Sequence, residues 1–294
     1  MRLFCDWGTS SFRLFLVNEQ GDVVTHTASS QGVSRLPRAE QPAYLLAQAQ
    51  QLVTSPADLD VLICGMAGSG LGLANAGYQA CPADARQLAR HLVPVTVPSL
   101  GRVQLVPGLS DEQTGADVMR GEETQLLGWL CMSELHQHGQ HRVCLPGTHS
   151  KWVQVQEGVI RGFSTAFTGE LYGLLVSQST LKPATDSHSD EGFQLGLDAS
   201  RSKQPLLNSL FTTRSKVLLY QMPAECAASY LSGLLIGTEV REFSAAGDGP
   251  VHIIANGRLS ALYAKAMAFY QLECQVHQGD GLSVAGLGKI AELM

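Results

Sequence analysis

Two short segments place a glycine and several hydroxyl side chains directly after an apolar run. They are DWGTSSFR at residues 6–13 and PGTHSKW at residues 146–152. A strand that ends in such a turn exposes consecutive backbone N–H groups and hydroxyls, which together bind phosphate oxygens. A single Gly-Thr turn is explained by ordinary turn chemistry. Its recurrence, at 8–9 and again at 147–148, favours two turns that hold a polyphosphate between them.

Both turns lie in predicted hairpins, and each hairpin opens a similar series of elements. In the first half, apolar alternation and turn residues predict strands at 3–7, 12–17 and 22–27, a helix at 39–53 and a strand at 59–66. In the second half they predict strands at 142–145, 151–156 and 159–167, a helix capped by Thr168, a strand at 251–256 and a helix at 259–270. The common order indicates an internal duplication and two α/β domains.

The segment at 111–139, between the two halves, carries acidic and apolar side chains at helical spacing. This pattern predicts an amphipathic helix where the two domains join. Glu122 and Glu123 lie in its sequence, and a pair of glutamates in a first helical turn interacts favourably with the helix dipole. Taken from the residues alone, the pair therefore has a purely structural explanation beside a catalytic one.

Composition limits the classes of partner. The 294 residues suffice for two domains with cores of their own, and a net charge of −6 with 16% charged residues gives no basic face for nucleic acid.

Seven scattered cysteines favour reduced thiols in a cytoplasmic protein over disulfides. His136, His138 and His141 are interpreted as an exposed connection, not a zinc site. No apolar run approaches the ~20 residues of a membrane span, so we expect no membrane contact. The oligomeric state stays open.

The two turns resemble the phosphate motifs of the sugar kinase and actin-like ATPase superfamily. More closely, several segments are similar to the 2-keto-3-deoxygalactonokinase family: DWGTSSFRLFL, QGVSRL, GMAGSGLG, DVMRGEETQLLG, PGTHSKWV, TGELYGLL and SGLLIGTEV. The resemblance implies an α/β fold of two ribonuclease-H-like domains with an interdomain cleft. Residues 1–135 would form the sugar-acid side and end in the junction helix. Residues 136–294 would form the nucleotide side, with the last helix returning to the junction.

The resemblance further implies a reaction and its cofactors. Members of this family use ATP and Mg²⁺ to phosphorylate the terminal hydroxyl of 2-dehydro-3-deoxy-D-galactonate in galactonate catabolism. Asp6 would orient hydrated Mg²⁺, and no second metal site is expected because Leu145 occupies the position that matches Asp6. The expected nucleotide contacts are Gly8, Thr9, Ser10, Gly147, Thr148, Lys151, Asn256 and Gly257, with Arg258 beside them.

Catalytic and substrate residues follow from the same resemblance. Sugar kinases place a catalytic acid at the start of the junction helix, which favours Glu122 as the base, then Glu123, with Asp117 as a third choice. The substrate carboxylate calls for an arginine, and the unranked candidates are Arg35 and Arg120, ahead of Arg13 on its strand. Gly68 and Ser69 of GMAGSGLG are expected to shape the sugar pocket.

Two other functions remain open at this point. A kinase of another sugar or sugar acid would carry the same motifs, because isolated motifs encode pocket specificity poorly. A nonenzymatic, actin-like nucleotide-sensing module would keep the phosphate turns without needing the acidic pair or an arginine for a carboxylate.

Overall fold

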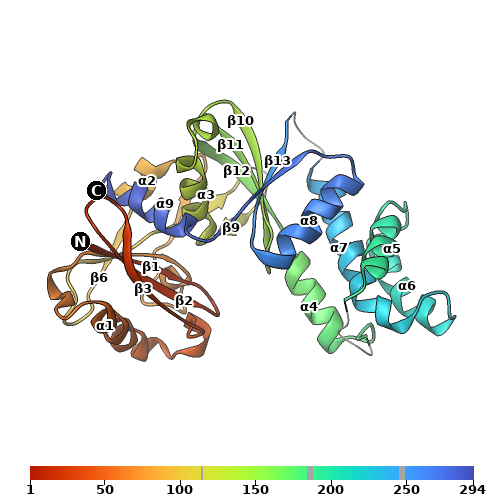
Figure 1. Ribbon diagram of the computed structural model, residues 1–294, viewed down its shortest axis with the longest axis horizontal. Coiled ribbons are helices and arrows are strands. Elements are labelled where there is room, and N and C mark those ends of the chain that lie inside the picture. The colour runs from red at the N-terminus through yellow and green to blue at the C-terminus, as the bar shows by residue number, and fades with distance from the viewer. Residues whose placement is uncertain (114, 184–187, 245–248) are drawn as a thin grey trace. The chain divides into compact units, whose positions relative to one another are not determined.

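A computed structural model describes residues 1–113, 115–183, 188–244 and 249–294 (Figure 1). The chain divides into two compact units. The first comprises Met1–Gln140, Gln154–Phe163 and Gly279–Met294, and the second comprises His141–Val153 and Ser164–Gln278.

The first unit contains a six-stranded mixed sheet in the order β3-β2-β1-β4-β7-β6. Its strands are β1 Arg2–Trp7, β2 Phe12–Val17, β3 Val23–Ser29, β4 Val61–Gly65, β6 Val93–Val95 and β7 Val103–Leu105. The hairpin of β1 and β2 agrees with the prediction because its alternation is local. In the register, Asp6 lies opposite Arg13 on β2 and opposite Cys64 on the parallel strand β4.

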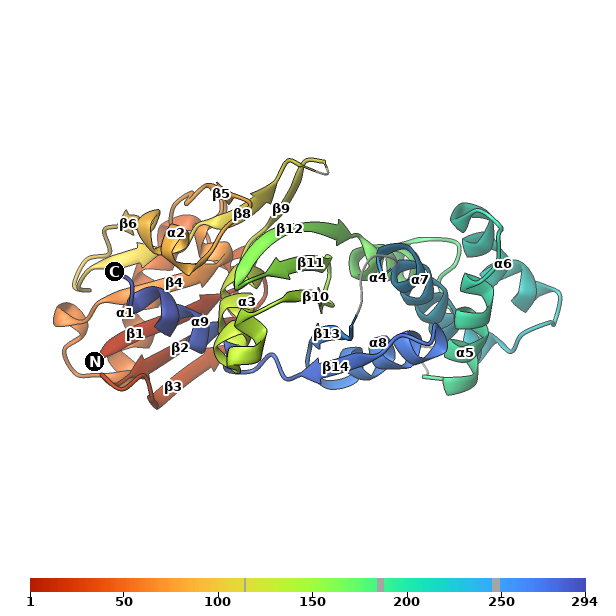
Figure 2. The same ribbon diagram turned by 90° about the horizontal axis from the view of Figure 1, so that it is seen from above.

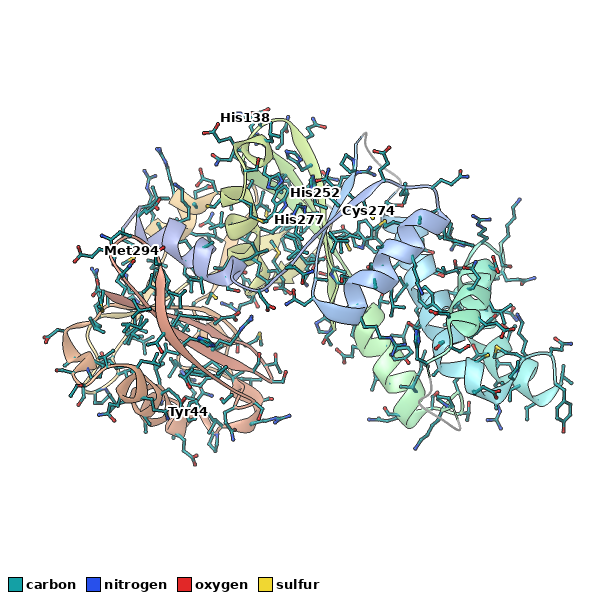
Figure 3. The ribbon with its side chains drawn as sticks, viewed as in Figure 1. Tyr44, His138, His252, Cys274, His277 and Met294 are labelled. Carbon is teal, nitrogen blue, oxygen red and sulfur yellow. The ribbon has the colours of Figure 1, made fainter. Side chains whose placement is uncertain are left out.

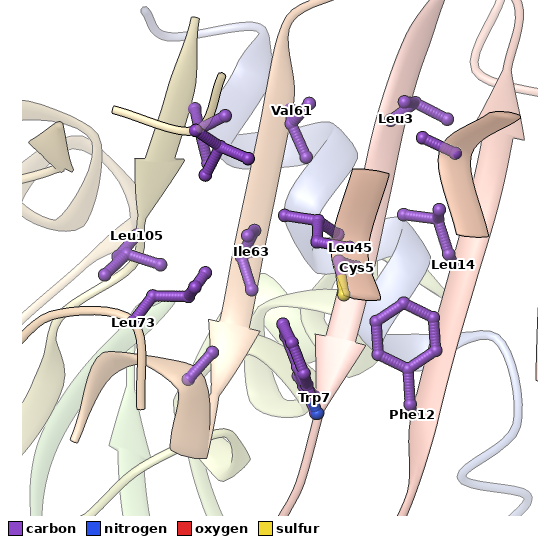
Figure 4. Close-up of a cluster of buried hydrophobic side chains, with 14 of the residues drawn as sticks. Leu3, Cys5, Trp7, Phe12, Leu14, Leu45, Val61, Ile63, Leu73 and Leu105 are labelled. Carbon is purple, nitrogen blue, oxygen red and sulfur yellow. The ribbon is translucent and has the colours of Figure 1, made fainter. Parts of the chain in front are cut away.

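Helices cover both faces of this sheet. Leu3, Cys5 and Trp7 point toward α1 (Gln41–Leu52), where Leu45 completes a buried cluster (Figure 4). The alternate residues of β1 face α9 (Leu282–Ala291), so that Phe4 lies beneath Gly288. Helix α9 packs closely on α3 (Glu122–Cys131), because a Cβ at Gly286 would lie only 1.9 Å from the Thr124 carbonyl oxygen.

The predicted helix over residues 111–139 is confirmed only in its middle, where α3 spans Glu122–Cys131, and it is wrong at both ends. A second sheet, in the order β5-β8-β9, consists of Tyr78–Ala80, Gly108–Asp111 and Asp117–Met119. Pairing with β8 holds 117–119 extended, and α3 begins only after Gly121, whose φ of 105° favours glycine. Helix α2 (Ala85–Arg90) completes the unit.

A five-stranded sheet in the order β12-β11-β10-β13-β14 carries most of the second unit, with helices beside it (Figure 2). Residues 154–156 of β11 and 159–163 of β12 belong to the first unit. The strands are β10 Gln140–Leu145, β11 Ser150–Gln156, β12 Val159–Ala166, β13 Val251–Ile254 and β14 Cys274–His277. The helices are α4 Thr168–Gln178, α5 Asp190–Ser200, α6 Leu206–Leu218, α7 Ala227–Phe243 and α8 Gly257–Phe269. Helices α5 and α7 approach closely, since a Cβ at Gly196 would lie 2.1 Å from the Tyr230 carbonyl oxygen.

The predicted N-cap of α4, Thr168, is wrong by one residue. The N-cap of α4 is Phe167, and Thr168 is already helical. The Thr168 hydroxyl instead hydrogen-bonds the buried carboxylate of Glu239. Within the described ranges, no helix is long and apolar enough to cross a membrane.

Candidate active site

The first phosphate turn joins β1 to β2 and is held through its carbonyl groups. The Gly8 amide donates to the Ser11 carbonyl at 2.9 Å, and the amides of Val33 and Ser34 donate to the carbonyls of Gly8 and Thr9. In the part of the chain that the structure describes, the amides of Thr9 and Ser10 donate to no acceptor. The turn therefore presents the consecutive N–H groups that an anion requires.

Asp6 lies beside this turn at the end of β1. Its Oδ2 accepts hydrogen bonds from Arg13 Nη2 at 2.6 Å and from Ser283 Oγ at 2.9 Å, and its side chain is 16% exposed. Gly65 on β4 lies beside the carboxylate; its φ is 86°, and a Cβ there would lie 2.8 Å from the Trp7 carbonyl oxygen and 3.6 Å from Asp6 Oδ1. Arg13 is thus bound to the predicted metal ligand, which weakens its case as a substrate ligand.

The acidic pair at the start of α3 occupies two different environments. Glu122 is partly exposed, and its Oε2 accepts from the Arg120 amide at 3.0 Å. Glu123 is 0% exposed and accepts from the Gly121 amide at 2.6 Å and from the Thr124 hydroxyl at 3.0 Å. Burial, together with the negative charge of Glu122, raises the pKa of Glu123 to about 8. Glu123 is therefore protonated at neutral pH.

The structure brings Asp6 and the acidic pair together. A Cβ at Gly121 would lie 3.4 Å from the Cα of Gly65, so α3 begins directly against the end of β4. Between them lies the buried thiol of Cys64, whose pKa is raised by burial and further by the carboxyl groups of Asp6 and Glu123. Asp117, the third candidate base, lies outside α3 on β9.

Arg120 immediately precedes this pair and has unused hydrogen-bonding capacity. Its Nη2 donates to the Gly77 carbonyl at 2.8 Å, and its guanidinium lies 4.5 Å from the centre of the Tyr78 ring. Its Nε and Nη1 are buried without a hydrogen-bond partner, and a Cβ at Gly68 would lie 2.9 Å from Nη1. Because buried guanidinium nitrogens normally find acceptors, this pair of free donors indicates a ligand with a planar anion.

The other predicted sugar-pocket residues differ in exposure. Ser69 is partly exposed in the loop after β4, where its hydroxyl accepts from the Leu71 amide. Arg35 is exposed and, among the described residues, forms no hydrogen bond or ion pair through its side chain. Arg120 is thereby distinguished from Arg35 by burial.

The second phosphate turn lies against the start of α4. A Cβ at Gly169 would lie 2.2 Å from the Gly147 carbonyl oxygen, and the Glu170 amide donates to the Thr148 carbonyl at 2.9 Å. Only glycine at position 169 permits this approach. Lys151 is only 5% exposed, and its Nζ donates to Thr165 at 2.7 Å, so a phosphate contact would require it to move.

A cavity of about 280 Å³ opens beside this turn within the second unit. Its lining is mostly apolar and comes from the turn and from α4, α7 and α8: Gly147, Thr168, Gly169, Tyr172, Ser232, Leu235, Ile236, Arg258, Leu259, Leu262 and Tyr263. Asn256 and Gly257 begin α8, with φ at Gly257 of 59°. An apolar cavity beside a glycine-containing turn suits a ligand with a flat apolar part.

A buried carboxylate links the elements around this cavity. Glu239 on α7 is 3% exposed and accepts from Trp152 Nε1 at 2.8 Å and from the Tyr263 hydroxyl at 2.7 Å. The Tyr263 hydroxyl also lies 2.8 Å from Ser150 Oγ, and the Thr168 hydroxyl bonds the same carboxylate. Burial raises the pKa of Glu239, against the opposing effect of these hydrogen bonds.

Comparison with known proteins connects these sites to a family. A sequence model of the 2-keto-3-deoxy-galactonokinase family matches residues 6–290. The chain belongs to this family. A probable 2-dehydro-3-deoxygalactonokinase of Rhizobium meliloti (strain 1021) is 36% identical in sequence, and the alignment covers 97% of this chain and 95% of the relative. The 2-dehydro-3-deoxygalactonokinase of Escherichia coli (strain K12) is 33% identical, with 97% and 96% covered.

One solved structure agrees with membership of the 2-keto-3-deoxy-galactonokinase family, and a second concerns the fold. A crystal structure assigned as a 2-dehydro-3-deoxygalactonokinase of Sinorhizobium meliloti has a TM-score of 0.89 at 33% identity, over 99% of this chain and 98% of that chain. The ADPNP-bound activator of 2-hydroxyisocaproyl-CoA dehydratase from Clostridium difficile has a TM-score of 0.53 at 12% identity, over 99% and 95%, which concerns the fold alone. The predicted fold of two ribonuclease-H-like domains, as in actin-like ATPases, is confirmed, and the chain is a phosphotransferase.

Sequence reasoning missed several residues of this kinase. Ser283, which donates to Asp6, comes from α9 at the other end of the chain, and Glu239 carries no local signal of its partners. The glycine at 169 could have been found, because TGELYGLL was already matched to the family.

The histidine patch predicted at 136–141 divides into different environments. His136 Nδ1 lies 2.9 Å from the Trp129 carbonyl oxygen, and His138 is exposed near Glu157. In the second unit, His252 Nδ1 lies 3.0 Å from His277 Nε2, on neighbouring strands (Figure 3). The pair His252–His277 was not anticipated from the sequence.

Proposed function

We propose that this kinase transfers the γ-phosphoryl group of ATP to the terminal hydroxyl of 2-dehydro-3-deoxy-D-galactonate, in D-galactonate catabolism. Support comes from two curated relatives named for this substrate, each aligned along nearly its full length. The observation that carries the proposal is Arg120, whose buried Nε and Nη1 lack acceptors within one site that also contains Asp6 and the acidic pair. A sugar acid supplies the carboxylate that these donors require, whereas a neutral sugar does not.

In this proposal the first unit binds the sugar acid and carries out the proton transfer. Glu122 takes the proton of the attacking hydroxyl as its oxygen forms a bond to the γ-phosphorus and the bond to ADP breaks. Glu123 is the poorer base because its pKa of about 8 keeps it protonated at neutral pH. Gly68 and Ser69 line the sugar side, and Arg120 fixes the carboxylate so that the far hydroxyl is oriented.

Asp6 fits a magnesium role of the water-mediated kind. Its Oδ1 has no hydrogen-bond partner among the residues described, and few direct protein ligands surround it. A hydrated Mg²⁺ would then be oriented by one carboxylate and would neutralise phosphate charge when bound. The amides of Thr9 and Ser10 would bind phosphate oxygens beside it.

The second unit is proposed to bind the nucleotide. Its cavity would take the nucleoside against Leu259, Leu262 and the start of α8 at Asn256 and Gly257. The turn at Gly147 and Thr148 would bind phosphate through backbone amides. Lys151 would join only by exchanging its bond to Thr165.

Mass spectrometry tests the substrate and the reaction together. The purified protein is incubated with MgATP and 2-dehydro-3-deoxy-D-galactonate, and fragmentation locates the added phosphoryl group. We expect transfer to the terminal hydroxyl, with kcat/KM above that for neutral sugars and for other sugar acids in a panel. A better acceptor in the panel would replace this substrate, and ATP binding without any acceptor-dependent ADP release would favour a nucleotide-sensing module.

A further inference from the structure

Gln41 is a fully buried amide side chain that joins two loops of the first unit. It is the first residue of α1 and is 0% exposed. Its Nε2 donates to the carbonyl of Leu36 at 3.2 Å and to the carbonyl of Leu71 at 2.9 Å. A carbonyl oxygen only accepts hydrogen bonds, so the NH₂ end of the amide must face both of them. One side chain therefore holds two segments that lie far apart in the sequence.

The oxygen of the same amide makes no contribution to the core. Oε1 is buried and, in the described part of the chain, has no hydrogen-bond partner. A buried acceptor without a donor costs free energy that an apolar side chain of similar length would not cost. The packing of α1 alone thus does not account for an amide at Gln41. Its role follows from the two loops that its NH₂ group holds.

The loop at 31–36 supports the first phosphate turn. The amides of Val33 and Ser34 donate to carbonyls of that turn at 3.1 Å each, and Ser34 Oγ donates to the Thr9 carbonyl at 2.7 Å. Gly32 approaches the turn so closely that a Cβ there would lie 2.2 Å from the Thr9 carbonyl oxygen. These contacts hold the peptide groups whose amides are proposed to bind phosphate. We name residues 31–36 the support loop.

The second loop, at 66–76, lies on the proposed sugar side. The Leu71 amide donates to Ser69 Oγ at 3.2 Å, so the two residues are held together. In the same loop, a Cβ at Gly68 would lie 2.9 Å from Arg120 Nη1. The backbone that Gln41 holds at Leu71 is therefore continuous with the backbone beside the proposed carboxylate ligand. We name residues 66–76 the sugar loop.

We propose that Gln41 is a positioning residue that couples the two substrate sites of the first unit. The inference rests on the proposed function, which places the sugar acid at Arg120 and phosphate at the first turn. A ligand that orders one loop also orders the other through Gln41, so the second ligand has less conformational entropy to remove and binds more tightly. Without the two bonds of Gln41, the support loop and the sugar loop would be ordered independently.

Calorimetric titration of the sugar acid, with and without a saturating nonhydrolysable ATP analogue and Mg²⁺, tests the proposal. In the wild type the analogue should lower the dissociation constant of the sugar acid by about fivefold or more. Gln41→Met keeps the length of the side chain but removes both donors, so this coupling factor should fall to about one. Gln50→Met makes the same exchange at an exposed position of α1 and should keep the wild-type factor. A merely structural role for Gln41 would lower the melting temperature and leave the factor unchanged.

Hydrogen exchange gives a readout in the wild type that does not depend on a variant that folds. The Gly72 amide donates to the Ser69 carbonyl at 3.0 Å within the sugar loop. The ATP analogue alone should slow exchange of the amides of Leu71 and Gly72, although it is proposed to bind elsewhere. In Gln41→Met this protection should disappear.

The outcomes separate this proposal from the proposed function. Wild-type protein that binds both ligands without coupling, or without protection of the sugar loop by the analogue, would overturn the role of Gln41 alone. Wild-type coupling in Gln41→Met, or equal loss of coupling in Gln50→Met, would do the same. Wild-type protein that binds no sugar acid would overturn the proposed function and the coupling together.

Discussion

Gly169 at the start of α4 lies so close to the second phosphate turn that a Cβ there would be 2.2 Å from the carbonyl oxygen of Gly147. Such a distance is impossible for real atoms, so an added methyl group must displace the turn or the helix. We expect Gly169→Ala to raise the ATP dissociation constant by about tenfold or more, since misplaced amides lose charge-assisted hydrogen bonds. Isothermal titration calorimetry with ATP measures this change.

The same helix supplies the control. A Cβ at Gly173 would meet nothing within 4 Å, so Gly173→Ala should leave ATP binding unchanged and stabilise the protein by about 0.5–1 kcal/mol through helix propensity. Equal ATP affinity in both variants would refute the role of Gly169.

Replacing Arg120 should show whether Arg120 or Arg35 binds the substrate carboxylate. Arg120→Met removes the charge but keeps much of the packing beside Tyr78, and we expect kcat/KM for the sugar acid to fall by about 10²-fold or more, with the KM for ATP little changed. Steady-state kinetics with each substrate varied measures the split. Arg35→Met, at an exposed position, should have a smaller effect, and the reverse order would assign the carboxylate to Arg35.

The buried carboxyl of Glu123 should make stability depend on pH. Its pKa is about 8 in the folded protein and near the ordinary glutamate value of 4.5 when unfolded, so the folded state binds more protons between these values. The free energy of unfolding therefore falls as pH rises through this window, by at most about 1.4 kcal/mol per unit. Urea denaturation from pH 5 to 8.5 should show this decline in the wild type and a flatter profile in Glu123→Gln. Parallel profiles would mean that Glu123 does not titrate in this range.

Glu122 should control turnover more than binding. Glu122→Gln keeps an acceptor for the Arg120 amide but cannot take a proton, and we expect kcat to fall by about 10²–10⁴-fold with ATP affinity within about threefold. Quench-flow measurement of the chemical step, beside ATP titration, distinguishes the two effects. If Glu123→Gln instead abolishes turnover, and wild-type kcat/KM rises with a pKa near 8, Glu123 is the base.

Elements set by local sequence patterns could be predicted from the sequence, whereas elements set by long-range contacts could not. Strand β2, predicted at 12–17, is found at Phe12–Val17, because alternation and turn chemistry act between neighbours. Asp117–Met119 was predicted as helix because the partner that makes it extended is β8, which its own spacing does not encode.

The candidate active site likewise contains local features that the sequence predicts and long-range features that it does not. The Gly-Thr turns were visible as short motifs, and in the first of them the amides of Thr9 and Ser10 donate to no acceptor among the described residues. The Arg120 guanidinium is held through Nη2 by the carbonyl of Gly77, 43 residues away, and its Nε and Nη1 are buried without acceptors. No short motif could have predicted this contact or this burial. Exposure also separates Glu122 from Glu123, although they are neighbours of identical chemistry.

Glu239 connects four elements around the proposed nucleotide cavity, so its exchange tests whether that network positions the cavity. In Glu239→Gln an amide NH₂ would face hydroxyl or indole donors, and one of these buried groups would lose its acceptor. We expect a loss of about 1–3 kcal/mol in the free energy of unfolding, and a rise in the ATP dissociation constant that persists at temperatures where the variant is fully folded. Chemical denaturation and calorimetry measure the two quantities separately. Glu242→Gln is the matched control, because Glu242 lies on the same helix, is exposed and, among the described residues, pairs with Arg241 alone. Destabilisation of Glu239→Gln with unchanged ATP affinity would assign the network to the core of the second unit and not to the nucleotide site.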